Sequence, residues 1–501
     1  MTLPRSLVPP RTSVQLRDVA HRLKSDGLLV QTDPRDAEIN GVTDDSRAIE
    51  HGDLFCAWKG TSSDSHDFLP AAQQAGATAA VVEREVTQTD LPQLVVTDGR
   101  RGAAAAASFV YGNPADRLVL AGVTGTNGKT TTAWITRHLL NDRQQAALIG
   151  TLGLWLDESG AVDGTEALTT PGPVDLAALF RVLVDRGVGA VAMEVSSHAL
   201  HQGRVHAARY DAAIFTNLTR DHLDYHHTLE SYRAAKLLLV KHLRPTGAAI
   251  INADDAAWEG VAAQAPRALS FSVRAESNAD VVARNIALHD RGSEFELRAH
   301  GFSAHVALPL LGDFNVQNAL GAAAAALSLG YTVAEVAALL GTVPQVPGRL
   351  ERIATDPCPV LRDYAHTPDA LERVLRTLRP LVRGRLIVVF GAGGDRDQGK
   401  RPQMGAIAEQ LADVAIVTSD NPRTENPDAI IDQIVAGMKR GSHERITDRR
   451  AAIAFALESG RAEDLVLLAG KGHENYQILG TTKHEFDERK VVRDLSSGAR
   501  A

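Results

Sequence analysis

The first chemistry visible in the sequence comes from a glycine-rich segment, Gly122–Thr131, which reads GVTGTNGKTT. Gly125 and Gly128 would allow backbone N–H groups to curve around phosphate oxygens, and Lys129 would add a positive charge. The hydroxyl group of Thr130 stands where a phosphate-binding loop places a Mg²⁺ ligand. These residue types in this order predict a loop that binds ATP together with Mg²⁺.

The spacing of this segment differs from the usual phosphate-loop pattern, G-x-x-x-x-G-K-[ST]. Val123 occupies the position of the first glycine, and Gly122 lies one residue earlier, which gives G-x-x-G-x-x-G-K-T. The apolar run Leu118–Val123 precedes the loop and a helix-like run follows it. Because phosphate loops connect a strand to a helix in this way, the context favours a nucleotide loop over a simple glycine-rich turn.

Further side chains have types suited to metal or carboxylate chemistry, but their positions alone leave other roles open. Glu194 ends an apolar strand, where a carboxylate can face the loops at the carboxyl edge of a parallel sheet. His222 and His226 are four residues apart. No cysteine or glutamate base accompanies them, so a zinc pair is not favoured. Lys236 lies in a predicted helix, Leu229–His242, and its spacing alone favours a solvated lysine.

The composition is that of an ordinary soluble globular protein, with 44% apolar and 23% charged residues. A length of 501 residues predicts about three domains, and a net charge of −8 argues against nucleic acid as the main partner. The most apolar long stretch, Ala319–Ala334, is rich in alanine and glycine and predicts a buried helix, so we expect no membrane insertion. Cys56 and Cys358 form no disulfide framework. We therefore expect a cytoplasmic protein, and a monomer.

Apolar runs and glycine- or proline-rich breaks divide the sequence into three blocks, residues 1–99, 100–344 and 345–501, the second opening with an alanine-rich helix, Gly102–Tyr111. In each block strand-like runs alternate with helix-like stretches, a pattern typical of parallel sheets. We predict an α/β protein with a small N-terminal α/β domain, a central phosphate-loop domain and a C-terminal Rossmann-like α/β domain. The predicted strands are Leu54–Trp58, Ala79–Val82, Leu94–Val96, Leu118–Val123, Gly189–Val195, Ala212–Phe215, Ala248–Ile251, Leu386–Phe390, Val414–Thr418 and Leu465–Leu468.

Short motifs follow the loop along nearly the whole chain. The central block contains MEVSSHAL, TNLTRDHLDYH, YRAAKLLL and GDFNVQNALGA, and the last block contains PGRLE, DYAHTPDAL, GAGGDRDQGKRP, SDNPRTENP and GKGHE. With GVTGTNGKTTT, they resemble the Mur ligases and the related folylpolyglutamate synthetases in both content and order. The N-terminal DDSRAIEHGDLFCAWKG resembles the domain with which Mur ligases hold a UDP-sugar. The whole set is most similar to the Mur ligases that add the third residue to the peptidoglycan precursor UDP-MurNAc-L-Ala-D-Glu.

The resemblance implies an ATP-dependent ligase that uses Mg²⁺ and forms an amide bond. ATP would phosphorylate a carboxylate of the precursor to an acyl phosphate, which the amine of an amino acid then attacks. By the same resemblance Lys236 would be carbamylated by CO₂ to N6-carboxylysine. The expected catalytic residues are Lys129, Glu194, His222 and Lys236, and the expected Mg²⁺ ligands are Thr130, Glu194, His222 and the Lys236 carbamate.

The resemblance also implies three binding sites for small molecules. The residues expected at ATP are Gly125, Thr126, Asn127, Gly128, Lys129, Thr130, Thr131, Asn315, Asn318, Arg349, Asp363 and His366. Those expected at UDP-MurNAc-L-Ala-D-Glu are Asp44, Ser46, Thr61, Ser62, Ser63, Thr169, Thr170, Ser196, Gln202 and Arg204. Those expected at the incoming amino acid are Arg396, Asp420, Asn421, Pro422, Arg423, Gly470 and Glu474.

The motif SDNPRTENP bears on which amino acid is added. Family members with Asp-Asn-Pro-Arg here use meso-2,6-diaminopimelate, whereas lysine users lack the arginine. Diaminopimelate differs from lysine by one carboxylate, which the planar fork of Arg423 could bind, and Glu474 suits a substrate ammonium group. One departure concerns the UDP-sugar site, because Ser65 stands where the family commonly has glycine in Asp-Gly-His, and the turn near the uridine could shift.

Other functions stay open at this point. The same ligation with L-lysine and a folylpolyglutamate synthetase share the chemistry, although the latter lacks a UDP-binding N-terminal domain. A GTPase switch would need an Asn-Lys-x-Asp motif, which this sequence does not contain. A nicotinamide enzyme using GAGGDR would need glycine where Arg396 stands.

Overall fold

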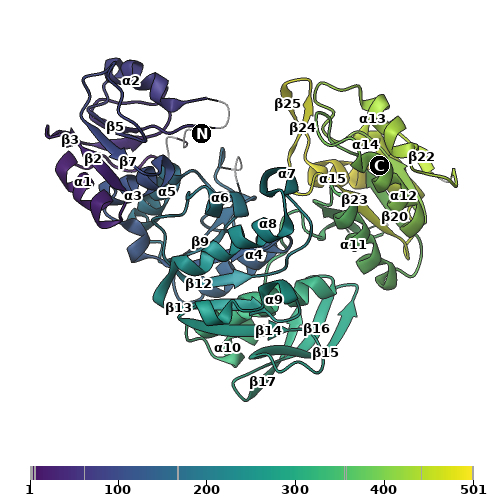
Figure 1. Cartoon of the computed structure of the whole chain (residues 1–501). Helices are drawn as coiled ribbons and strands as arrows, with labels where there is room; N and C mark the ends of the chain where they lie inside the picture. Colours follow the sequence, from purple (N-terminus) through teal and green to yellow (C-terminus); the bar gives the residue numbers. More distant parts are fainter. Residues whose placement is uncertain are drawn as a thin grey trace. The chain divides into compact units, whose positions relative to one another are not determined.

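The computed structural model describes residues 4, 7–60, 63–165, 169–354, 356, 358–441 and 443–498. The contacts divide the chain into two compact units, which are described one at a time. Unit 1 comprises Met1–Arg284, Leu297–Ala304 and Gln317–Leu340, and unit 2 comprises Asn285–Glu296, His305–Val316 and Gly341–Ala501 (Figure 1). Within the described ranges, no helix is long and apolar enough to cross a membrane.

The first sheet of unit 1 has five strands in the order β2-β7-β6-β5-β4, parallel except for β2. Its central strands are buried on both faces and apolar except for Asp53 and Gln93, as expected of parallel strands that helices cover. The strands are β2 (Leu29–Thr32), β4 (Gly41–Thr43), β5 (Asp53–Cys56), β6 (Ala79–Val82) and β7 (Gln93–Val96), with the small pair β1 (Val14–Gln15) and β3 (Glu38–Ile39). The helices are α1 (Leu16–Ser25), α2 (Leu69–Ala75) and α3 (Gly99–Val110).

Helix α3 is the alanine-rich helix that the sequence places at the start of the central block. In the structure it belongs to the core of the first sheet, because Ala103, Ala106 and Val110 share one hydrophobic cluster with the strands. Val174 and Ala177 of α5 (Pro173–Asp185), which belongs to the central part of the chain, join the same cluster. A continuous core therefore links the first sheet to the next, and the boundary at residue 99 stays a prediction.

The second sheet has ten strands in the order β10-β9-β11-β8-β12-β13-β14-β15-β16-β17. Neighbouring strands from β9 to β15 are parallel, and β10 is an antiparallel edge strand. The strands are β8 (Val119–Thr124), β9 (Ala146–Gly150), β10 (Gly153–Trp155), β11 (Ala190–Glu194), β12 (Tyr210–Phe215), β13 (Leu243–Asn252), β14 (Arg267–Ser272), β15 (Val281–His289), β16 (Gly292–Ala299) and β17 (Phe302–Leu308). Strands β8, β11 and β12 therefore bring their carboxyl ends to one edge, where the site described below lies.

Two predicted helices of this part are interrupted in the structure. The predicted helix Leu229–His242 is α8 (Leu229–Leu237) followed by a 3₁₀ helix, Leu238–His242. The predicted helix Ala319–Ala334 is split between α9 (Asp313–Ser328) and α10 (Val333–Leu340). Gly330 between them has a φ of 88°, a conformation that ends a helix and that glycine adopts without strain. The remaining helices are α4 (Lys129–Leu140), α6 (Ser197–His201) and α7 (Leu223–His226).

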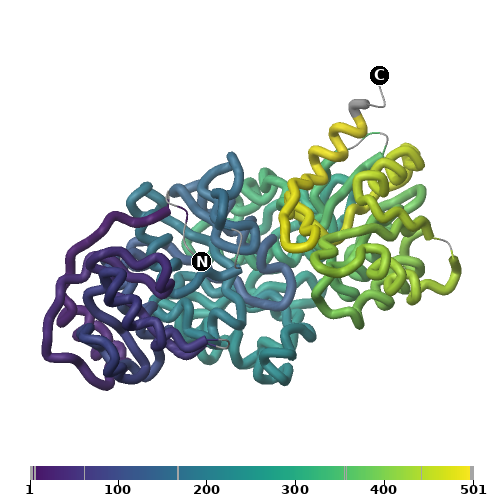
Figure 2. Tube along the Cα trace, turned by 90° about the horizontal axis from the view of Figure 1, so that it is seen from above, coloured from purple at the N-terminus to yellow at the C-terminus, as the bar shows by residue number. Residues whose placement is uncertain are grey.

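Unit 2 contains a six-stranded sheet in the order β18-β19-β23-β20-β21-β22, parallel except for β18. The strands are β18 (Glu351–Ala354), β19 (Val360–Asp363), β20 (Leu386–Phe390), β21 (Val414–Val417), β22 (His443–Arg445) and β23 (Leu465–Ala469), with a separate hairpin, β24 (Tyr476–Leu479) and β25 (Thr482–Glu485). The helices are α11 (Pro368–Leu378), α12 (Lys400–Leu411), α13 (Pro427–Val435), α14 (Arg449–Ser459) and α15 (Glu488–Gly498), the last one drawn in yellow at the end of the tube in Figure 2. The predicted α/β architecture with a large central parallel sheet is confirmed.

Candidate active site

The phosphate loop follows β8 and leads into α4, as predicted. Gly125 has a φ of 149° and Gly128 a φ of 83°, both within the range that disfavours side chains. A Cβ atom at Gly125 would collide with the hydroxyl group of Thr216, and one at Gly128 would collide with the amide oxygen of Asn318. Both glycines are therefore required by close packing as well as by backbone conformation.

The segment after β12 fixes the shape of this loop. The N–H groups of Thr126 and Asn127 donate to the backbone and side-chain oxygens of Asn217, at 2.7 and 2.9 Å. The hydroxyl of Thr216 in turn donates to the carbonyl of Asn127 at 2.7 Å. Because these N–H groups point at the protein, we expect any phosphate contact to come from the N-terminal turn of α4, where Thr130 and Thr131 are buried.

Two lysines converge on one carbonyl oxygen of the loop. Lys129 Nζ donates to the carbonyls of Gly125 and Thr126 at 3.0 and 2.8 Å, and Lys236 Nζ donates to the same Gly125 oxygen at 2.7 Å. Lys236 is buried in α8, against the ring of Tyr232. Burial, together with the neighbouring Lys129, lowers the pKa of Lys236 well below its usual value. Lys236 is therefore buried beside the phosphate loop, although its spacing in the sequence alone favours a lysine that faces solvent.

The carboxylate of Glu194 lies at the carboxyl end of β11, next to β8. Its oxygens accept hydrogen bonds from the N–H and the hydroxyl of Thr151, at 2.8 and 3.3 Å. Glu194 is 1% exposed and packs directly over Gly150, where a Cβ atom would collide with the carboxylate. Thr151 is a positioning residue that the sequence pattern does not single out.

His222 belongs to a cluster of rings that also includes His198, Tyr225, His226 and Tyr232. Its ring centroid lies 4.9 Å from that of His198 and 6.0 Å from that of Tyr232. Burial lowers the pKa of His222, with further lowering from Lys129 and Lys236 that Asp221 opposes. His226 donates to or accepts from Ser197 Oγ at 3.0 Å.

The side chains expected at Mg²⁺ are of a suitable type for that ion. Across the part of the chain that the structure describes, no group of three or more His, Cys, Asp or Glu side chains could hold a metal by itself. The expected set instead combines a threonine hydroxyl, one carboxylate, a lysine that would become a carbamate and the imidazole of His222. The first three supply the oxygen donors that Mg²⁺ prefers, whereas the imidazole supplies nitrogen. An unmodified Lys236 ammonium group would not fit, so the fit depends on its modification.

A hydrogen-bonded network joins the residues expected at the precursor peptide to Glu194. Thr170 Oγ1 donates to the Glu194 carbonyl at 2.9 Å and accepts from Ser196 N at 3.0 Å. Thr169 contacts Thr151 through their hydroxyls at 3.2 Å. Gln202 Oε1 accepts from the Nε and Nη2 atoms of Arg204, at 2.9 and 2.7 Å. The structure therefore brings these residues together, as the sequence predicts.

Arg204 is the cation of this network. Its Nη1 donates to the Thr170 carbonyl at 3.1 Å, so its bonded partners are neutral oxygens. Burial, and the nearby Arg100, lower the pKa of Arg204. In the described ranges no carboxylate lies within ion-pair distance of its guanidinium group. Such a half-buried, unneutralised cation favours an anionic ligand.

The residues expected near the uridine lie in loops of the first sheet. Asp44 and Ser46 follow β4, burial raises the pKa of Asp44, and Ser63 accepts a hydrogen bond from Gly60 N at 2.8 Å. Thr61 and Ser62 lie outside the described residues. Ser65 begins a 3₁₀ helix that Asp64 caps, and its φ is not positive. The turn there does not depend on the glycine that the family commonly has.

In unit 2, the residues expected near the nucleotide gather around Tyr364. Arg349 lies over the Tyr364 ring, with its guanidinium carbon 4.7 Å from the centroid, and His366 Nδ1 is 2.7 Å from the Tyr364 carbonyl. Asp363 ends β19 and accepts from Leu350 N at 2.8 Å, and burial raises its pKa. Of the two α9 asparagines, Asn315 donates to the Leu311 carbonyl at 2.8 Å. Asn318, in unit 1, packs against the phosphate loop as described above.

The residues expected at the amino acid lie after β21 and β23. Asn421 donates to Glu474 Oε2 at 2.8 Å, and Gly470 lies against the carboxylate of Asp420. Burial raises the pKa of Glu474, against the lowering effect of Lys471. Lys471, which is fully buried, donates to Asn421 Oδ1 at 3.1 Å. The sequence motif GKGHE contains Lys471, but its role as a support for Asn421 is visible only in the structure.

The side chains of two arginines approach Gly393 from the direction in which its Cβ would point. A Cβ atom at Gly393 would lie 3.0 Å from Arg423 Nη1 and 3.8 Å from Arg396 Cγ. Arg423 has a φ of 51° and donates from Nη1 to the Gly394 carbonyl at 2.7 Å. Pro422 is buried directly beneath, against Gly394. The two guanidinium groups and the Glu474 carboxylate can together bind an amino acid that carries an additional carboxylate.

Known proteins resemble the chain over most of its length. Residues 123–326 match the Mur ligase middle domain, residues 348–472 the Mur ligase glutamate ligase domain, and residues 38–116 the Mur ligase family catalytic domain. The chain is 44% identical over 472 residues to UDP-N-acetylmuramoyl-L-alanyl-D-glutamate--2,6-diaminopimelate ligase of Gloeobacter violaceus, covering 93% of this chain and 95% of that protein. It is 45% identical over 460 residues to the ligase of the same name from Geobacillus kaustophilus, covering 90% and 93%. A solved structure of a ligase of that name has a TM-score of 0.73 and 33% identity, covering 98% of this chain and 100% of the other.

Proposed function

Because the chain belongs to the Mur ligase family, we propose that it joins meso-2,6-diaminopimelate to the D-Glu γ-carboxylate of UDP-MurNAc-L-Ala-D-Glu. The reaction consumes ATP and yields ADP and phosphate. The observation that carries the choice of amino acid is the pair Arg396 and Arg423 beside Gly393, with Glu474 near enough for the charge of Arg423 to act on its carboxylate. Relatives of 44% and 45% identity over nearly the whole chain are named as ligases of the same substrate.

The phosphate loop binds ATP through the N-terminal turn of α4 and through Lys129. On nucleotide binding, Lys129 Nζ exchanges its contacts with the loop carbonyls for contacts with phosphate oxygens. The transferred phosphoryl group passes to the D-Glu γ-carboxylate, forming an acyl phosphate and releasing ADP. The amine of the amino acid then attacks the acyl carbon, phosphate leaves, and an amide bond is formed.

Thr130, Glu194, His222 and the carbamate of Lys236 would hold Mg²⁺, which offsets the negative charge that develops during phosphoryl transfer. Carbamate formation requires a neutral lysine, and the burial that lowers the pKa of Lys236 supplies one. The neutral Nζ atom attacks CO₂ and loses one proton, so a neutral amine becomes an anionic carbamate. The Gly125 carbonyl that Lys236 now contacts is then released.

Arg204 would bind a carboxylate of the precursor peptide. Gln202 and the Thr170 carbonyl hold its guanidinium group in place without neutralising it. The link from Thr170 to Glu194 supports a bound precursor whose reacting end would lie beside the residues proposed for phosphoryl transfer. ATP and UDP-linked precursors occur in the cytoplasm, and both cysteines are free and buried, so we place the reaction there, with the protein acting as a monomer.

The test is an ATP-dependent assay with UDP-MurNAc-L-Ala-D-Glu and each of meso-diaminopimelate, L-lysine and L-glutamate, with ADP release and the mass of the product as readouts. We expect a product larger by one diaminopimelate residue, at a rate that depends on the precursor. Incorporation of L-lysine at a comparable rate would instead identify the protein as a lysine-adding ligase. Addition of glutamate to a folate, with no use of the UDP precursor, would instead identify the protein as a folylpolyglutamate synthetase.

A further inference from the structure

Two loops of unit 2 lie directly on each other below the amino-acid pocket. One follows β20 and contains Gly394, and the other follows β21 and contains Asn421 and Pro422. Gly394 N donates to the Asn421 carbonyl at 2.9 Å, and a Cβ atom at Gly394 would collide with the Pro422 carbonyl. The first loop carries Arg396 and the second carries Arg423, so the contact between the loops sets the distance between the two cations.

A partly buried ion pair between Arg401 and Glu425 holds these loops together. Arg401, in the first turn of α12, is 0% exposed, and its Nη1 and Nη2 atoms each donate to one oxygen of Glu425 at 2.8 Å. Arg401 also donates to Gln433 Oε1 at 2.8 Å and to the Gly393 carbonyl at 3.1 Å. The two-pronged contact with Arg401 lowers the pKa of Glu425 to about 2. Arg401 therefore connects α12 to both loops.

Glu425 extends this connection to the residues next to the two cations. Its Oε1 accepts from Asp395 N at 2.6 Å, and the Asp395 carboxylate accepts from Thr424 N and Oγ1 at 3.2 and 2.7 Å. Asp395 and Arg423 have φ values of 54° and 51°, a left-handed conformation that non-glycine residues rarely adopt. Such conformations persist where surrounding contacts determine them, and these hydrogen bonds supply the contacts.

The ion pair also has an electrostatic consequence. Glu425 is two residues from Arg423, yet both of its oxygens are bound to Arg401. Throughout the described ranges no carboxylate lies within ion-pair distance of Arg396 or Arg423. Both guanidinium groups therefore keep their charge for a substrate carboxylate, while the acid closest to Arg423 in the sequence is held by a third arginine.

We infer that Arg401 is a positioning residue for amino-acid selectivity: by pairing with Glu425 it fixes the two loops and keeps that carboxylate away from Arg423. This inference rests on the proposed function, in which Arg423 binds the distal carboxylate of diaminopimelate. It adds a residue outside the pocket, which acts on the substrate only through Glu425. Replacing Arg401 releases a carboxylate that competes with the substrate for Arg423.

The test compares Arg401→Gln, Glu425→Gln and the double variant in the ligation assay, with KM measured separately for meso-diaminopimelate and ATP. Arg401→Gln should raise the diaminopimelate KM at least tenfold and leave the ATP KM within about twofold, because the released Glu425 then occupies Arg423. Glu425→Gln should raise it less than threefold. The double variant should resemble Glu425→Gln, since no competing carboxylate remains. A double variant as poor as Arg401→Gln, or an equal change in both KM values, would overturn the inference.

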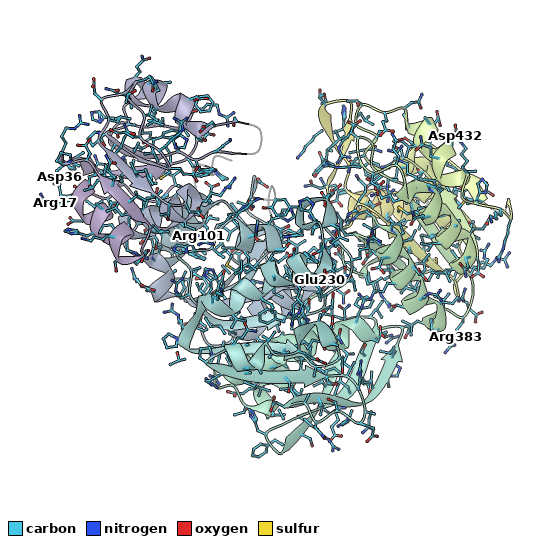
Figure 3. The ribbon with its side chains drawn as sticks, in the orientation of Figure 1. Arg17, Asp36, Arg101, Glu230, Arg383 and Asp432 are labelled. Atoms are coloured by element: carbon cyan, nitrogen blue, oxygen red, sulfur yellow. The ribbon has the colours of Figure 1, made fainter. Side chains whose placement is uncertain are left out.

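The matched control is Asp432→Asn. Asp432, labelled in Figure 3, also pairs with an arginine, Arg445, in unit 2. Both side chains of that pair are exposed, so its loss should leave every KM unchanged. Arg401→Lys covers the case in which Arg401→Gln does not fold. It keeps the charge without the two-pronged contact and should give an intermediate increase in the diaminopimelate KM, whereas an unchanged KM would count against the inference. A wild-type enzyme that does not use diaminopimelate would instead refute the proposed function.

Discussion

Arg423 offers the sharpest test of how this protein selects its amino acid. It lies half-buried after β21, and one of its guanidinium nitrogens is already bonded to the Gly394 carbonyl at 2.7 Å. The remaining donors are available to the distal carboxylate of diaminopimelate, which lysine lacks. Replacing Arg423 by alanine removes this contact and leaves the phosphate loop untouched, because that loop belongs to unit 1.

The expected magnitude follows from the partial burial of the guanidinium group. A hydrogen bond to a charged partner contributes about 1.5–3 kcal/mol, and solvent screening at a half-exposed group moves the value toward the lower end. At about 1.4 kcal/mol per factor of ten, Arg423→Ala should raise the diaminopimelate KM about 10- to 100-fold. Lysine lacks the distal carboxylate and leaves the half-buried Arg423 without that partner, so the wild-type enzyme should reject it by at least about a hundredfold.

The assay measures initial rates of ADP release at saturating precursor while the concentration of one amino acid or of ATP is varied. The ATP KM should change less than about twofold in Arg423→Ala. Arg383→Ala is the control, because Arg383 is an exposed arginine of the same unit (Figure 3) and should behave as wild type. Efficient incorporation of L-lysine by the wild-type enzyme, or an unchanged diaminopimelate KM in Arg423→Ala, would refute the assignment of this pocket.

Three further predictions concern unit 1. Lys129→Ala should lower kcat by at least about a hundredfold, since contacts to a transferring phosphoryl group contribute several kcal/mol. A folded variant with normal turnover would contradict the assignment of this loop to ATP. Lys236→Ala and Lys236→Arg should both be nearly inactive. Wild-type activity should fall after CO₂ is stripped and return when bicarbonate is added. Glu230→Gln, which changes an exposed residue on the same helix (Figure 3), should have no effect. Burial and the neighbouring Asp44 raise the pKa of Asp175 from 3.8 to about 7, so the stability from its protonated form is lost as pH rises toward 7. Relative to wild type, Asp175→Asn should gain about 1.4 kcal/mol of unfolding free energy per pH unit between pH 5 and 7, and parallel stability curves in chemical denaturation would contradict this.

The parts of the fold that could be predicted from the sequence are those with a strong local signal. The run Leu386–Phe390 predicts β20 with its observed bounds, because a strand buried on both faces is continuously apolar. The run Leu118–Val123 predicts β8 to within one residue, and the phosphate loop follows from the positions of Gly125 and Gly128. In each case the residues that determine the structure are neighbours in the chain.

The supporting contacts could not be predicted, because their partners are distant in the sequence. Asn217 holds a loop 90 residues earlier, and Lys471 supports Asn421, 50 residues away. Periodicity also gives no sign that Lys236 is buried, since a lysine in an amphipathic helix usually faces solvent. Only the folded structure shows that α8 directs it at the Gly125 carbonyl.

The two units use one arrangement to hold the cations that we propose bind anionic substrates. In unit 1, Gly125 packs against the segment after β12 and its carbonyl accepts from Lys129; in unit 2, Gly394 packs against the segment after β21 and its carbonyl accepts from Arg423. A neutral carbonyl orients a cation without cancelling its charge, whereas a carboxylate partner would have to be displaced by the substrate at a cost in binding energy. The glycine is required because any side chain would separate the two loops, and with them the cation from the carbonyl that orients it. We therefore expect alanine at Gly394 to raise the diaminopimelate KM as Arg423→Ala does, although it removes no group that touches the substrate.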